Sequence, residues 1–100
     1  MQKRGKGLSG HEQLGRKECM LFIFGYNARH ALWMRGMKFP IDVLWLNEKK
    51  KIVDIKENLK PAKMFEFKTY SPDKDAMYVI ELPAGFVKSN KIRASTTIKF

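Results

Sequence analysis

The feature of this sequence that most constrains its fold is a series of short apolar runs, each closed by a turn signal. No apolar pattern of period 3.6 continues for three helical turns, whereas runs of this length are typical of strands. We therefore predict a mostly β (α+β) fold, a small, partly closed, antiparallel-rich β-barrel with one or two short helices. The predicted strands are 19–24, 31–34, 41–46, 51–57, 64–70, 76–82 and 96–100.

The clearest local prediction is a hairpin in which the polar tetrad 47–50 joins strands 41–46 and 51–57. Segment 64–70 alternates with a period of two, so we expect an amphipathic strand with Phe65 and Phe67 on one face. Short helices are predicted at 9–14, from a capping box of Ser9 and Glu12, and at 86–91. The expected core contains Leu21, Ile23, Trp33, Val43, Trp45, Val53, Val79 and Leu82.

A chain of 100 residues fits one domain, which we expect to span 1–100 with residues 1–6 as a basic, flexible arm. Twenty Lys and Arg against ten Asp and Glu give a formal charge of +10, which favours acidic partners. Nucleic acid, anionic lipid and acidic protein surfaces all meet this condition. Fifteen of the cations are lysines, which are less suited than arginine to forked recognition of phosphate.

A single cysteine, Cys19, excludes an internal disulfide and favours a reducing compartment, so we expect a cytoplasmic protein. The longest apolar run, 19–24, is too short to cross a bilayer, and we expect no membrane segment in this chain. His11, His30 and Cys19 follow no zinc-ligand spacing, so neither a metal nor another cofactor is expected. We expect a monomer.

Four segments together resemble a known family. They are Gly7-Leu8 with Leu14, Glu18 and 20–24; Trp33-Met34-Arg35 with 40–43; Ile52-Val53 with 57–59 and Pro61; and 78–85. This series resembles the family catalogued as domain of unknown function 192, also called uncharacterised protein family 0127. The resemblance implies a compact barrel-like β fold with one or two short helices, and no established activity.

Asp42 stands out because it lies among apolar residues in the run 41–46, and a buried carboxylate needs compensation. Either a cation and backbone donors hold it, or it is a carboxyl poised for proton transfer. We favour a structural ion pair with Arg35. Glu57 and Glu81 also end apolar strands, and the three carboxylates could converge on one barrel mouth. If a functional pocket exists, we expect Trp33, Arg35, Asp42, Glu57 and Glu81 to line it.

The aromatic residues Phe65, Phe67 and Tyr70 lie beside Lys63 and Lys68, a combination that could stack single-stranded nucleic acid. The competing interpretation is that aromatic residues alternating along a strand pack a core, and we favour it because no nucleic-acid recognition motif is present.

The best hypothesis for function is a small soluble domain that binds an anionic ligand or partner through a pocket or its basic surface. The alternatives are an enzyme that uses Asp42, Glu57 or Glu81 as acid or base, and a basic nucleic-acid-binding or adaptor domain. The sequence favours a binding function over an enzymatic one, and it does not identify catalytic residues.

Overall fold

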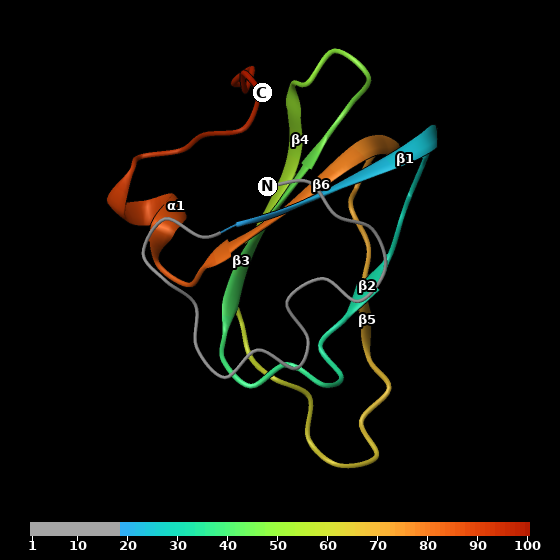
Figure 1. The fold of residues 1–100 in the computed structure, drawn as a ribbon, viewed down its shortest axis with the longest axis vertical. Helices are drawn as coiled ribbons and strands as arrows, with labels where there is room; N and C mark the ends of the chain where they lie inside the picture. Colours follow the sequence, from blue (N-terminus) through green and yellow to red (C-terminus); the bar gives the residue numbers. More distant parts are fainter. Residues whose placement is uncertain (1–18) are drawn as a thin grey trace.

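A computed structural model describes residues 19–100, which form six strands and one short helix. The strands are β1 Met20–Ala28, β2 Leu32–Trp33, β3 Ile41–Leu46, β4 Ile52–Leu59, β5 Thr69–Tyr70 and β6 Ala76–Pro83, and the helix is α1 Phe86–Ser89. β1, β6, β3 and β4 form a four-stranded antiparallel sheet in that order, and β2 pairs with β5 in a separate small sheet (Figure 1).

The position of β3 explains its composition. It lies between β6 and β4, and all six of its residues are buried. A strand that is covered on both faces needs apolar residues at successive positions rather than alternate ones, which accounts for the continuous run 41–46. The fully buried Trp45 satisfies its one polar atom by donating from Nε1 to the His30 carbonyl, at 3.0 Å.

The predicted hairpin between 41–46 and 51–57 is confirmed as β3 and β4. Asn47 organises the turn, since its side-chain Oδ1 accepts hydrogen bonds from the backbone N–H groups of Lys49 and Lys51, at 2.9 and 3.1 Å. The Asn47 carbonyl also accepts a bond from Lys50 N–H, and Lys50 has a positive φ of 63°. An asparagine at the start of a tight turn typically makes such contacts.

The four-stranded sheet buries a separate apolar cluster on each face. Met20, Phe22, Val43, Trp45 and Val79 belong to the first cluster, against which Leu32 and Tyr70 of the small sheet pack. Leu44, Leu46, Ile52, Ile80 and Leu82 belong to the second, together with Val87 of α1 and, at its edge, Ile92 and Ile98. The small sheet therefore covers one face, and α1 with the C-terminal segment covers the other (Figure 1).

The mostly β, antiparallel character is confirmed, but no closed barrel is found among residues 19–100. Two predicted strands are wrong. Only Thr69–Tyr70 of 64–70 pairs with another strand, because a turn closed by Glu66 N–H and the Lys63 carbonyl interrupts the segment. Segment 96–100 contributes one isolated bridge, between Lys51 and Thr97.

The first strand is longer than predicted. Residues 25–27, which follow the predicted strand 19–24, lie inside β1, and the register against β6 shifts between Ile23 and Ala28. The shift includes Gly25, a residue type often found where a strand is irregular. The helix predicted at 86–91 is confirmed as the shorter α1, and the one predicted at 9–14 lies outside the described residues.

Four of the predicted core residues, Val43, Trp45, Val79 and Leu82, are buried. Leu21, Ile23 and Val53 are half-buried, and Trp33 was wrongly assigned, since it is 48% exposed. Trp33 belongs to a two-residue strand of the small sheet, which has one face against the core and one open. Across residues 19–100, no helix has the length and apolar character that crossing a bilayer requires.

Candidate functional site

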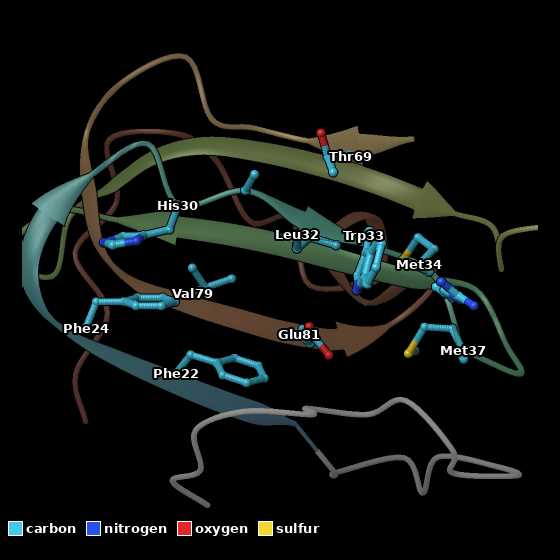
Figure 2. Close-up of a pocket in the computed structure, with 13 residues that line it drawn as sticks. Phe22, Phe24, His30, Leu32, Trp33, Met34, Met37, Thr69, Val79 and Glu81 are labelled. Carbon is cyan, nitrogen blue, oxygen red and sulfur yellow. The ribbon is translucent and has the colours of Figure 1, made fainter. Parts of the chain in front are cut away.

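A cavity of about 530 Å³ lies between the four-stranded sheet and the small sheet. Figure 2 shows its lining. β1 and β6 contribute the floor, and β2 with the segments around it contributes the opposite wall. The lining residues are Phe22, Phe24, His30, Ala31, Leu32, Trp33, Met34, Arg35, Gly36, Met37, Thr69, Val79 and Glu81.

Side chains alternate between the two faces of a strand, and this alternation decides which residues of β1 and β6 face the cavity. Phe22 lies opposite Val79 in the register of β1 and β6, and directly opposed residues of an antiparallel pair point to the same face. Two positions further along β6, Glu81 lies on that face as well, opposite Met20 of β1 and Val43 of β3. Ile80 and Leu82, on either side of Glu81, pack in the second cluster on the other face.

His30 fixes the end of the cavity that the β1–β2 connection forms. Its ring stacks on Phe24 with the centroids 3.7 Å apart and the planes at 10°. Its Nε2 lies 3.0 Å from the carbonyl oxygen of Tyr26, and its own carbonyl accepts the Trp45 indole N–H. Because these contacts hold the backbone and the ring together, His30 is a preformed part of the wall.

The other end of the cavity carries Trp33 and Arg35, both exposed at its rim. The Arg35 guanidinium carbon lies 5.7 Å from the centroid of the Trp33 ring and 5.4 Å from that of Phe67. Cation–π contacts of this length hold the guanidinium beside the two rings. Gly36, with a φ of 82°, follows in a turn whose Met34 carbonyl accepts the N–H of Met37.

Glu81 brings a carboxylate into this mainly apolar cavity, where it is only 8% exposed. Figure 2 shows its side chain on β6, at the floor of the cavity. A buried carboxylate can accept several hydrogen bonds, so it can bind a hydroxyl or amino group in addition to partners within the protein.

Asp42 does not belong to this cavity. It is fully buried and lies opposite Leu82 of β6, so it points to the second face of the sheet, away from Glu81. Its Oδ1 accepts the Asn58 N–H at 2.8 Å, and its Oδ2 accepts the Val87 N–H at 2.9 Å. The ion pair predicted with Arg35 is wrong, because backbone amides hold the carboxylate and Arg35 lies over Trp33 and Phe67.

Of the five predicted pocket residues, the structure brings together Trp33, Arg35 and Glu81. Glu57 is exposed on β4 and, like Asp42, does not line the cavity, so the three carboxylates do not converge on one mouth. The cavity is also lined by residues that were not predicted from the sequence: Phe22, Phe24, His30, Met34 and Met37. The alternation of Phe22 and Phe24 in 19–24 was the available signal, but it does not distinguish a cavity from a packed core. Within the described part of the chain, no three His, Cys, Asp or Glu residues are grouped to hold a metal ion.

The fold and the cavity define a class of protein: a small antiparallel β domain with an apolar cavity of ligand size under a short second sheet. The chain belongs to the DUF192 family, described as "Uncharacterized ACR", whose model matches residues 1–100. A UPF0127 protein of Thermococcus kodakarensis is 30% identical over 98 residues, covering 98% of this chain and 59% of the relative. A second UPF0127 protein, from Pyrococcus abyssi, is 31% identical over 84 residues, covering 82% of this chain and 67% of the relative.

Two solved structures have the same fold. A protein of unknown function from Novosphingobium aromaticivorans has a TM-score of 0.86 at 21% identity, covering 95% of this chain and 66% of that one. A "putative transcription regulator" from Sinorhizobium meliloti has a TM-score of 0.82 at 29% identity, covering 90% and 67%. The chain thus spans about three fifths to two thirds of the length of these relatives.

Proposed function

We propose that this domain binds an anionic small molecule with an apolar body, held in the cavity between the two sheets. The observation that carries the proposal is the cavity itself. Its volume of about 530 Å³ lies within the range of small-molecule sites, and aromatic and methionine side chains make up much of its lining. Methionine adapts to ligands of different shape, so Met34 and Met37 favour a ligand class over a single compound.

Arg35 supplies the preference for an anion. Its guanidinium lies at the rim, where contacts with Trp33 and Phe67 limit its motion before a ligand arrives. Arginine can bind a carboxylate or phosphate through two parallel hydrogen bonds. The ligand's apolar body would lie between Phe22 and Trp33, and Glu81 would accept a hydrogen bond from a hydroxyl or amino group.

An enzyme with paired carboxylates is the weaker proposal. The sheet separates Asp42 from Glu81, and Glu57 lies on the exposed part of β4. Acid–base pairs need two groups within reach of one substrate. Of the three carboxylates, Glu81 alone lines the cavity.

A nucleic-acid-binding function would follow the description of the Sinorhizobium relative as a regulator. The described residues offer little support for groove recognition, since their one helix, α1, has four residues. A recognition helix needs several turns to present side chains to base edges.

The test is binding of anilinonaphthalene sulfonate, an aromatic anion whose fluorescence rises in an apolar site. We expect saturable binding that Ala31→Trp abolishes, because Ala31 is exposed at the cavity and an indole there would block it. Arg35→Met should weaken binding by about tenfold, since a charge-assisted hydrogen bond contributes about 1.5 kcal/mol.

The matched control is Ala94→Trp, which adds the same ring at an exposed alanine that does not line the cavity. Equal binding by the wild type and by both tryptophan variants would place the probe elsewhere and overturn the proposal.

A further inference from the structure

The loop between β4 and β5 forms a second surface, separate from the cavity floor, at the lower end of the molecule in Figure 1. Its tip is the turn 63–66, closed by the bond from Glu66 N–H to the Lys63 carbonyl at 3.0 Å. The two central residues, Met64 and Phe65, are 84% and 82% exposed. These are the most exposed of the large apolar side chains in the described part of the chain.

The backbone holds Phe65 outward in an unfavourable conformation. Its φ is 65°, in the left-handed region that glycine or asparagine usually occupies at this position of a turn. A bulky apolar residue there gains nothing from burial within the fold and opposes the local backbone preference. The turn therefore presents an apolar side chain to the surroundings at a cost to folding.

Phe67 and Trp33 extend this apolar surface toward the body of the domain. Both are exposed, at 59% and 48%, and the Arg35 guanidinium lies over both rings. We call Trp33, Met64, Phe65 and Phe67 the tip patch. Trp is enriched where proteins meet the boundary between water and lipid, and Trp and Phe are common on the apolar face of segments that lie in that boundary.

Exposed lysines flank the tip patch in the sequence. Segment 60–68 contains Lys60, Lys63 and Lys68, all exposed, against the single acidic residue Glu66. Lys68 lies over the Tyr70 ring, with its Nζ 5.0 Å from the centroid. An apolar tip flanked in the sequence by exposed lysines complements a surface that has an anionic outer layer and an apolar interior, because lysine stems can extend from an apolar contact to a charged layer.

We propose that the tip patch docks this domain on an anionic lipid bilayer, with Met64 and Phe65 inserted among the lipids and the lysines against the headgroups. The shape of the surface favours this partner over a second copy of the chain. A projecting turn with two exposed side chains can insert into a lipid bilayer, because the lipids rearrange around it. Stable protein interfaces, in contrast, are broad and complementary in shape. Stacking of nucleic acid would use the rings of Phe65 and Phe67 but gives Met64 no role.

The experiment is co-sedimentation of the full chain with vesicles of phosphatidylcholine and with equimolar phosphatidylcholine and phosphatidylserine. We expect binding only to the second, falling as salt rises. Phe65→Gly should weaken it by roughly tenfold, because the largest inserted side chain is lost. Glycine suits the left-handed position, so the thermal midpoint of this variant should not fall. In Phe65→Trp, the emission of the added indole should shift to the blue on binding.

The electrostatic control compares two variants of equal net charge. Lys63→Glu with Lys68→Glu should lose vesicle binding, while Lys74→Glu with Lys88→Glu, which changes exposed lysines away from the tip, should retain most of it. Equal losses in both, or no effect of Phe65→Gly, would overturn the proposal. So would a dimer that Phe65→Gly dissociates, or single-stranded RNA binding lost in the tip variants without any vesicle binding. Anilinonaphthalene sulfonate binding should persist in Phe65→Gly, which separates this proposal from that of the cavity.

Discussion

At the scale of single residues, the arrangement around Asp42 explains why a carboxylate lies in the most buried strand. Its two oxygens accept backbone N–H groups from β4 and from α1, and no buried side-chain oxygen or nitrogen of the described residues lacks a partner. Gly85, which precedes α1, has no side chain to cap the helix. Asp42 caps it from a neighbouring strand, and its negative charge suits the positive end of the helix dipole.

Replacing Asp42 with Asn should lower the free energy of unfolding by about 3 kcal/mol, because one amide N–H would face a donor in place of an acceptor. Urea unfolding measures the change. Since Arg35 does not contact Asp42, Arg35→Met should add its own small effect and should not rescue the variant. Rescue in the double variant would show that the two side chains interact.

At the scale of secondary-structure elements, the β3–β4 hairpin depends on its turn as well as on its strands. Asn47 satisfies two backbone donors, and next to it the Glu48 carboxylate accepts the Asn27 side-chain N–H at 2.8 Å, linking the turn to β1. A hydrogen bond from its own backbone N–H, followed by the one from Asn27, lowers the pKa of Glu48 below its usual value.

Asn47→Ala should destabilise the protein by about 1 to 2 kcal/mol, because it removes the acceptor of two backbone N–H groups in the turn. Lys49→Ala, at an exposed position of the same turn, is the matched control and should leave the midpoint of urea unfolding unchanged. A similar effect of both substitutions would mean that the Asn47 side-chain contacts contribute nothing specific.

The elements also show how far the sequence could be interpreted. Apolar runs located β3 and β6, because central strands must be apolar whichever neighbour they pair with, and the sequence pattern also located the edge strands β1 and β4. The alternation of apolar and polar residues in 64–70 led to a wrong strand prediction, because that pattern shows side-chain polarity and not whether the backbone pairs with another strand. Only Thr69 and Tyr70 find partners, and the left-handed Phe65 breaks the rest.

The cavity residues were predicted only in part, because their grouping also depends on how distant strands pair. Glu81 was identified as a carboxylate at the end of an apolar strand, and Trp33 and Arg35 as a large ring and a cation within the family motifs. That Asp42 and Glu81 lie on opposite faces depends on the register of β3 against β6, which places Asp42 beside Leu82. Register is set by contacts between distant segments. The alternation of side chains along one strand therefore could not show whether Asp42 and Glu81 share a face of the sheet.

At the scale of the whole molecule, the formal charge of +10 is large for 100 residues. Among the residues that the structure describes, Lys56 forms an ion pair with Asp54 at 3.5 Å. Self-repulsion of a net charge this far from zero destabilises the compact state.

Raising sodium chloride from low concentration to about 0.15 M, where the screening length is about 8 Å, should therefore raise the thermal midpoint by a few degrees. Differential scanning calorimetry measures the shift. Lys74→Glu with Lys88→Glu lowers the net charge by four and should flatten the salt dependence. A thermal midpoint that falls with salt would indicate that local attractions outweigh the overall repulsion.

The left-handed backbone at Phe65 has a consequence for how this position can change. A glycine there would relieve about 1 kcal/mol of conformational strain, so selection for stability alone favours losing the phenylalanine. Selection for attachment to a bilayer favours keeping it. The residue is thus a point where the two pressures oppose each other, and a chain that keeps an apolar side chain on the turn gives up stability that a single substitution would restore.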